Sequence, residues 1–136
     1  MPAEAPLVLV VEDDPETRHF YMEAFARAGF QVDQAHNGHQ ALDKALECHP
    51  DLILTDIAVP GLDGIELCKR IRAEERTRVL PVLAITGYGD RGYPDRVIEA
   101  GANQVLIKPC DPERIVEEAR RLLSADRMPA LKASGK

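Results

Sequence analysis

The sequence predicts an α/β fold in which five parallel strands and five helices alternate as an open, doubly wound sheet. Four apolar segments are short, nearly continuous and rich in Val, Ile and Leu, namely residues 7–11, 52–55, 81–86 and 104–108. Parallel strands have this composition because helices cover both faces of their sheet. Segments with helical spacing separate the strands, and 136 residues are too few for an eight-fold barrel.

The second strand along the chain is the weakest of the five. Residues 30–35 alternate between apolar and polar side chains, which suits an edge strand. The first helix is expected after Asp14-Pro15, with Asp14 as its cap and Gly29 at its end. Its apolar face is expected to contain Phe20, Ala24, Phe25 and Ala28.

The other helices follow similar signals. One covers residues 38–48, and Asp63 is placed to cap the next. The apolar side of that third helix consists of Ile65, Leu67, Cys68 and Ile71. A short fourth helix is expected to begin near Pro94, after a glycine-rich loop. The last helix follows Asp111-Pro112, and its apolar side consists of Ile115, Val116, Ala119, Leu122 and Leu123.

Composition and charge limit the classes of function. The formal net charge is -6 and no basic stripe is present, so direct binding of nucleic acid is not expected. No apolar run is long enough to cross a bilayer, and the first residues lack the basic start of a secretory signal. Three scattered cysteines indicate a cytoplasmic protein rather than a disulfide framework. One domain over residues 6–125 is expected, with flexible ends at residues 1–5 and 126–136.

Polar residues stand where the predicted strands end. They are Glu12 and Asp13 after the first strand, Asp56 after the third, Thr86 at the fourth and Lys108 at the fifth. The carboxyl ends of parallel strands share one edge, where the sites of open α/β sheets form. Crowded carboxylates recruit a cation, and oxygen ligands with few carboxylates favour Mg²⁺. An aspartate nucleophile, a hydroxyl donor and a lysine counter-ion suit phosphoryl transfer through an aspartyl phosphate.

Some of the acids have a simpler interpretation. Asp14 and Asp63 precede helices and are expected to be helix caps. Asp56 is followed by Ile-Ala-Val, which does not start a helix, so capping does not account for it. Lys108 alone would be taken as a solvent-facing lysine. Its position after an apolar strand, together with the acids and Thr86, favours a functional role.

Four segments, taken in order, match a known family: VLVVEDDP, LILTDIAVPGLDGIEL, VLAITGYGD and GANQVLIKPCD. They resemble the receiver domains of response regulators in two-component signalling, over about residues 6–125. The resemblance implies a flavodoxin-like receiver fold with strand order 2-1-3-4-5. It also implies a domain that accepts a phosphoryl group on Asp56 from a histidine kinase or a histidine phosphotransfer protein. Such a domain catalyses only its own phosphotransfer and dephosphorylation, and signals to a downstream protein by changing conformation.

The resemblance assigns a role to each matching residue. The site for Mg²⁺ or Mn²⁺ would be built from three side chains and one backbone carbonyl, those of Glu12, Asp13, Asp56 and Ala58. Asp13 would be the direct ligand of the acidic pair. Thr86 would contact the phosphoryl group, and Lys108 would hold it as a counter-ion. The peptide bond between Lys108 and Pro109 is expected to be cis.

Three positions depart from the family pattern. Val105 stands where the family usually has Tyr or Phe, a ring that turns inward as the threonine moves, and a β-branched side chain does not act as such a switch. Ala58 is smaller and Tyr88 larger than usual at the two places that flank the phosphoryl group. We therefore hypothesise that Tyr88, or the glycine-rich loop that contains it, replaces the aromatic switch.

Three other functions share features with a phosphorylated receiver. Because of Val105, a degenerate receiver that acts as a protein-interaction module without phosphorylation stays open. A phosphatase with an aspartate nucleophile usually has a second Asp two residues later, where this chain has Ala58. Residues 87–92 match the dinucleotide pattern G-x-G-x-x-G, but Tyr93-Pro94 interrupts the helix that should follow. A monomer or weak dimer is expected, and the chain either stands alone or belongs to a longer protein.

Overall fold

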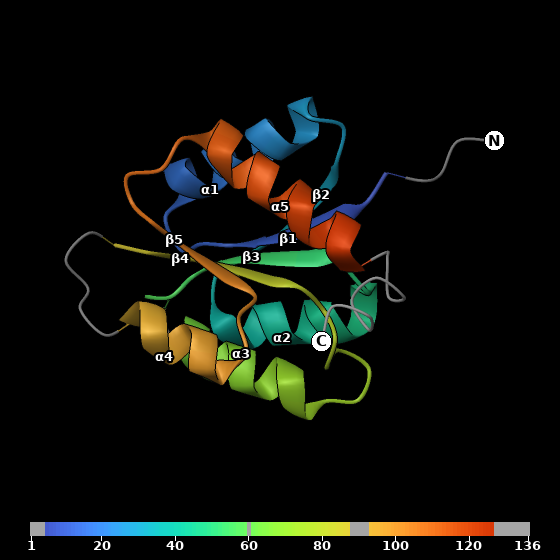
Figure 1. The fold of residues 1–136 in the computed structure, drawn as a ribbon, viewed down its shortest axis with the longest axis vertical. Helices are drawn as coiled ribbons and strands as arrows, with labels where there is room; N and C mark the ends of the chain where they lie inside the picture. Colours follow the sequence, from blue (N-terminus) through green and yellow to red (C-terminus); the bar gives the residue numbers. More distant parts are fainter. Residues whose placement is uncertain (1–4, 60, 88–92, 127–136) are drawn as a thin grey trace.

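The computed structural model describes residues 5–59, 61–87 and 93–126 of the chain. Within these residues strands and helices alternate along the chain (Figure 1). The strands are β1 (Leu7–Val11), β2 (Gln31–Ala35), β3 (Leu52–Asp56), β4 (Val82–Thr86) and β5 (Gln104–Ile107). The helices are α1 (Pro15–Arg27), α2 (Gly38–Cys48), α3 (Gly64–Ala73), α4 (Tyr93–Ala100) and α5 (Pro112–Asp126). The predicted α/β alternation is confirmed.

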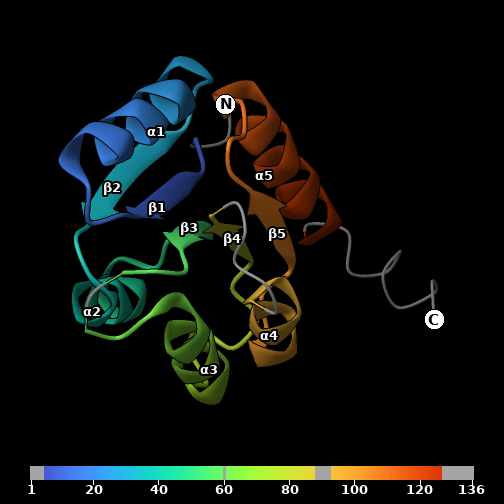
Figure 2. The same cartoon turned by 90° about the vertical axis from the view of Figure 1, so that its left-hand side faces the viewer.

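The strands form one parallel sheet in the order β2-β1-β3-β4-β5, which confirms the expected order. β2 lies at an edge, as its alternating pattern predicts. Helices α1 and α5 cover one face of the sheet, and α2, α3 and α4 cover the other (Figure 2). The strand order reverses between β1 and β3, so a crevice is expected beyond the carboxyl ends of these two strands.

Each face of the sheet has its own apolar core. In β1, Leu9 and Val11 belong to the core under α2, α3 and α4, whereas Val8 and Val10 belong to the core under α1 and α5. Every residue of β3 and β4 is buried. Burial on both faces explains why these strands are continuous apolar segments in the sequence.

The helices begin where their capping residues predict. Asp14 caps α1 and Asp63 caps α3, and each accepts a hydrogen bond at 2.9 Å from the amide three residues later. Both predicted caps are thus confirmed. Asn37 caps α2 in the same way at 2.8 Å. The apolar sides predicted for α3 and α5 lie in the two cores.

The predicted apolar face of α1 is wrong at Phe20. This side chain is 53% exposed, whereas the buried residues of the helix are Arg18, Tyr21 and Phe25. These three residues are spaced i, i+3 and i+7, so they form one stripe along the helix. The prediction followed the most apolar side chains, and the buried stripe of the folded helix includes an arginine instead.

Some predictions fall outside the described residues. Tyr88 lies there, with the rest of residues 88–92, where the sequence predicts a glycine-rich loop. The predicted flexible ends also lie there except for Ala5 and Asp126, the latter being the last residue of α5. None of the helices that the structure describes is long and apolar enough to cross a membrane.

Candidate functional site

An acidic loop, residues 12–14, follows β1 and places Glu12 inside the molecule. Glu12 is only 3% exposed, and its amide donates to the Ala35 carbonyl of β2 at 3.1 Å. Its Oε2 accepts a hydrogen bond from the Asp14 amide at 3.0 Å. Its Oε1 is buried and has no hydrogen-bond partner among the described residues. A buried carboxylate oxygen without a donor is costly, so this atom is a candidate ligand for a cation.

Asp56 is the last residue of β3, and its carboxyl group is held from two sides. Oδ1 accepts from the Ala58 amide at 3.0 Å, and Oδ2 accepts from Lys108 Nζ at 2.6 Å. Helix α3 begins at Gly64, close to the backbone that follows Asp56: a Cβ on Gly64 would lie 2.7 Å from the Ile57 Cα. Glycine is therefore needed at the start of α3 to let it pack on the backbone that carries Asp56.

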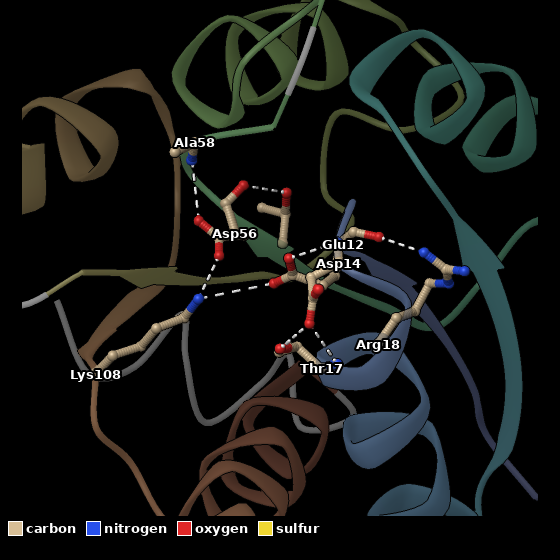
Figure 3. A network of polar contacts seen from close by, with 8 residues as sticks. Glu12, Asp14, Thr17, Arg18, Asp56, Ala58 and Lys108 are labelled. Carbon is tan, nitrogen blue, oxygen red and sulfur yellow. Dashed lines mark hydrogen bonds and ion pairs between the residues drawn. The ribbon is translucent and has the colours of Figure 1, made fainter.

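Lys108 joins the two acids (Figure 3). Its amide donates to the Thr86 carbonyl at 2.8 Å, which fixes the end of β5 beside the end of β4. Its Nζ lies 2.6 Å from Asp56 Oδ2 and 3.7 Å from Glu12 Oε1. The peptide bond from Lys108 to Pro109 is cis, as expected. One ammonium group thus balances two buried carboxylates.

The charges at this edge alter the proton affinities of the side chains. Burial raises the pKa of Glu12 to about 7; the bond from the Asp14 amide opposes this rise, and the neighbouring Asp56 adds to it. Burial lowers the pKa of Lys108, but its contact with Asp56 more than offsets this, so the net shift is upward. Lys108 is therefore a charged ammonium, and the edge lacks positive charge for its two acids.

The structure brings together part of the predicted residue set. Glu12, Asp56 and Lys108 converge, and Thr86 lies beside them at the end of β4, only 1% exposed. Asp13 is exposed, and no group of three or more acidic, His or Cys side chains in the described part of the chain is placed to hold a metal ion. Asp13 would have to turn toward Glu12 and Asp56 to share a cation with them.

The residue at the expected switch position packs as an aliphatic core residue. Val105 is half-buried and contacts the core under α2, α3 and α4. Ala58, two residues after the phosphoacceptor candidate, is exposed. Tyr88 lies outside the described residues.

Arg18 is a polar residue of this site that the sequence did not suggest. It is 8% exposed, and its Nη1 donates to the Glu12 carbonyl at 2.8 Å while its Nε donates to Gln34 Oε1 at 2.8 Å. A signal was available in the sequence. Arg18 stands three and seven residues before Tyr21 and Phe25, which places it on the buried stripe of the helix.

A groove of about 670 Å³ opens beside Lys108 on the α1 side of the molecule. Phe20 and Tyr21 of α1 line it from one side, and Lys108, Pro109 and Cys110 line it from the other. Since Lys108 Nζ contacts Asp56, the groove leads from an exposed aromatic side chain to the edge of the acidic site.

A doubly wound sheet whose carboxyl edge holds two buried acids and a lysine is the arrangement expected of a receiver-type signalling domain. Residues 8–120 match the family model of the response regulator receiver domain. The chain belongs to this family of two-component signalling proteins, whose receiver domains work with histidine kinases.

Relatives with known names support this membership. ResD of Bacillus subtilis is 35% identical over 116 residues, which is 85% of this chain and 47% of ResD. RpaA of Synechocystis is 35% identical over 125 residues, covering 91% of this chain and 52% of RpaA. The chain thus spans about half the length of these two relatives. DivK of Brucella ovis is 32% identical over 116 residues, which is 85% of this chain and 94% of DivK.

Solved structures agree with the fold. A response regulator from Chloroflexus aurantiacus superposes with a TM-score of 0.85 at 34% identity, covering 88% of this chain and 98% of that one. The receiver domain of the sensor histidine kinase PA1611 from Pseudomonas aeruginosa has a TM-score of 0.82 at 29% identity, with the same coverage of both chains. That structure has a magnesium ion coordinated in the active-site cleft.

Proposed function

We propose that this chain is a cytoplasmic receiver that accepts a phosphoryl group on Asp56 in a Mg²⁺-dependent reaction and signals by changing conformation. The phosphodonor would be a histidine kinase or a histidine phosphotransfer protein. One observation carries the proposal. The strand-end carboxylate of Asp56 lies 2.6 Å from Lys108 Nζ, beside a second buried carboxylate whose Oε1 lacks a donor among the described residues.

The arrangement fits a nucleophilic carboxylate. In the proposed step an Asp56 oxygen forms a bond to phosphorus while the P–N bond of the donor's phosphohistidine breaks, and the imidazole leaves. The Ala58 amide holds the carboxyl group of Asp56 through its other oxygen. Lys108 pairs with the acid before the reaction and is positioned to follow the negative charge onto the phosphoryl oxygens. Thr86 would donate to a further phosphoryl oxygen.

The acidic edge also fits a divalent cation. Glu12 and Asp56 supply buried carboxylate oxygens, Ala58 would supply its carbonyl, and Asp13 would join them by turning inward. Mg²⁺ commonly uses one or two carboxylates and keeps several waters, so these groups suffice. When bound, the ion would offset the negative charge that gathers on the transferred phosphoryl group. Mn²⁺ takes similar ligands.

The groove between α1 and Pro109 is the proposed approach of the donor. It joins an exposed aromatic residue, Phe20, to Lys108 and therefore to the acceptor carboxylate. The proposal includes no direct contact with nucleic acid or membrane, and a monomer or weak dimer as the working state. The downstream protein would be recognised through the changed conformation of the receiver.

The output is proposed to pass through the loop after β4, which contains Tyr88, rather than through Val105. Val105 is an aliphatic side chain already packed on the α2–α4 core, so it has no ring to turn inward. In a two-dimensional NMR spectrum, the amide shifts of α4 and β5 that acetyl phosphate produces should shrink in Tyr88→Ala. Equal shifts in wild type and variant would remove this part of the proposal.

The phosphoacceptor role is tested by intact mass after incubation with acetyl phosphate, with and without Mg²⁺. The wild type should gain one phosphoryl group only with Mg²⁺, and Asp56→Asn should gain none. Asp43→Asn, which changes an exposed acid of α2, is the matched control and should behave as the wild type. No gain in the wild type under any condition would instead indicate a phosphorylation-independent interaction module.

A further inference from the structure

We propose that Arg18 is a positioning residue for the cation site: its buried guanidinium holds the backbone of Glu12 and thereby directs the acidic loop toward Asp56. The inference rests on the proposed function, because it concerns the cation that the phosphoacceptor site would take. Arg18 touches neither the acceptor nor the phosphoryl group in this scheme. It acts through the backbone of the loop.

Glu12 is fixed at three of its four polar backbone and side-chain atoms. Its amide is bonded to Ala35 of β2 at 3.1 Å, and its carbonyl accepts from Arg18 Nη1 at 2.8 Å. Its Oε2 accepts from the Asp14 amide at 3.0 Å. The remaining atom, Oε1, is the buried oxygen without a hydrogen-bond partner among the described residues. The loop is therefore held in a way that leaves one oxygen aimed at the site, and Arg18 provides one of the three anchors (Figure 3).

Arg18 is itself held in place. Its Nε donates to Gln34 Oε1 of β2 at 2.8 Å, so the planar guanidinium bridges β2 and the acidic loop. No carboxylate in the described part of the chain lies within ion-pair distance of it. A buried charge without a direct counter-ion is costly in the stripe of α1 that also contains Tyr21 and Phe25. Proteins accept a local loss of stability of this kind mainly at functional sites.

Two effects of Arg18 on a cation have opposite signs. Its positive charge, close to the acids, repels a divalent ion, whereas its hydrogen bond keeps the ligand loop in the binding geometry. The hydrogen bond is direct, while the charge lies on the far side of the loop backbone from the Glu12 carboxylate (Figure 3). Positioning should therefore dominate. Removing such a supporting group typically weakens metal binding by roughly 10- to 100-fold.

The test is an NMR titration of the ¹⁵N-labelled chain with MgCl₂, following the amides of Asp13, Asp14 and Ile57. The variants are Arg18→Met and Arg18→Lys, and the Mg²⁺ dissociation constant should rise roughly tenfold in both. Lysine keeps the charge but lacks the planar fork that bridges two acceptors. Gln34→Leu, which keeps the arginine and removes its second acceptor, should give a smaller rise. Arg27→Met changes an exposed arginine of the same helix and should leave the constant unchanged.

Each outcome decides the matter. If Arg18→Met binds Mg²⁺ more tightly and Arg18→Lys binds as the wild type, charge rather than position is the role of Arg18, and the inference is wrong. Unchanged constants in variants that are merely less stable to urea would also overturn it. Should Arg18→Met fail to fold, Arg18→Lys and Gln34→Leu still decide. If the wild type takes the phosphoryl group and the Arg18 variants bind Mg²⁺ normally, this inference is wrong and the proposed function stands. A wild type that neither binds Mg²⁺ nor gains mass sinks the proposed function as well.

Discussion

Charged side chains lie at both ends of the parallel strands, and their hydrogen-bond partners differ: Arg72 at the amino ends is partly buried, whereas Glu12 and Asp56 at the carboxyl ends are buried. At the amino edge, the Arg72 guanidinium donates five hydrogen bonds: two to the Gly101 carbonyl, one each to the carbonyls of Leu80 and Arg78, and one to Asn103 Oδ1. At the carboxyl edge, two buried acids share one ammonium group, and Oε1 of Glu12 has no hydrogen-bond donor among the described residues.

The difference separates a structural polar cluster from a functional one. A buried polar network with all its partners ties its elements together and has no affinity left for a ligand. Arg72 ties α3 to the segments before β4 and β5 in this way. The acids of the carboxyl edge lack positive charge, so this edge is less stable than it could be and has capacity to bind a cation and a phosphoryl group.

The largest expected effect on stability is at Arg72, whose guanidinium has all its hydrogen-bond partners. Arg72→Met should lower the free energy of unfolding by about 2–4 kcal/mol, because it leaves several carbonyls and Asn103 without their donor. Urea denaturation measures this loss, and Arg70→Met, an exposed arginine of the same helix, should change stability by less than about 0.5 kcal/mol. Phosphorylation of Arg72→Met by acetyl phosphate should be unaffected below its unfolding transition. A loss of phosphorylation in the folded variant would mean that the two edges are coupled.

Sequence patterns predicted most of the fold because they report on burial along single elements. The continuous apolar strands, the caps Asp14 and Asp63, and the strand-end position of Asp56 are all local signals, and the structure contains each of them. Arg72 and Arg18 were not predicted to matter, because their acceptors belong to other segments. The acceptors of Arg72 are mainly backbone carbonyls, and those of Arg18 are the Glu12 carbonyl and Gln34 Oε1. Any residue type has such carbonyls, so only the folded chain shows where they face a guanidinium.

The same limit applies to the candidate site. The identities of Glu12, Asp56 and Lys108 and their common edge followed from strand order and spacing, which a sequence can indicate. Side-chain direction could not be predicted in this way: Asp13 is exposed while its neighbour Glu12 is buried. Side-chain direction in α1 was also not predicted. The apolar Phe20 lines the exposed groove, whereas Arg18 lies in the buried stripe of the helix.

A second, smaller effect on stability is expected when the negative charge of Glu12 is removed from the carboxyl edge. Glu12→Gln should stabilise the metal-free protein at pH 8 by about 1–2 kcal/mol, because it removes a buried negative charge next to Asp56. Burial raises the pKa of Glu12 from 4.5 to about 7, so its favourable contribution is present below pH 4.5 and is lost as the pH rises through about 7. The gain of the variant should therefore grow between about pH 5 and pH 8.

Urea midpoints in EDTA across that pH range measure the gain of Glu12→Gln. Glu16→Gln, an exposed acid in the first turn of α1, is the matched control for the loss of an acid at the surface. A Glu12→Gln variant that is less stable than the wild type at pH 8 would show that the carboxylate is satisfied in the folded protein. The contrast between the two edges would then be lost.

The smallest effect is expected at Glu118, a second buried glutamate whose surroundings differ from those of Glu12. Its carboxylate has donors: Arg121 Nη2 lies 2.7 Å from Oε1, and Arg114 Nε lies 3.4 Å from Oε2. The hydrogen bond from Arg121 is the main cause of a lowered pKa of Glu118, the opposite of the shift at Glu12. Its contribution is therefore present above the ordinary pKa and is lost as the pH falls through the lowered value.

Glu118→Gln should accordingly cost about 0.5 kcal/mol at pH 7, since both arginines are largely exposed and solvent screens the pairs. The cost should be smaller at about pH 4 than at pH 7, and Glu117→Gln, an exposed neighbour, serves as the control. Urea midpoints at the two pH values measure it. If Glu118→Gln and Glu12→Gln responded to pH with the same sign, the number of donors around a buried carboxylate would not explain the difference between the two sites.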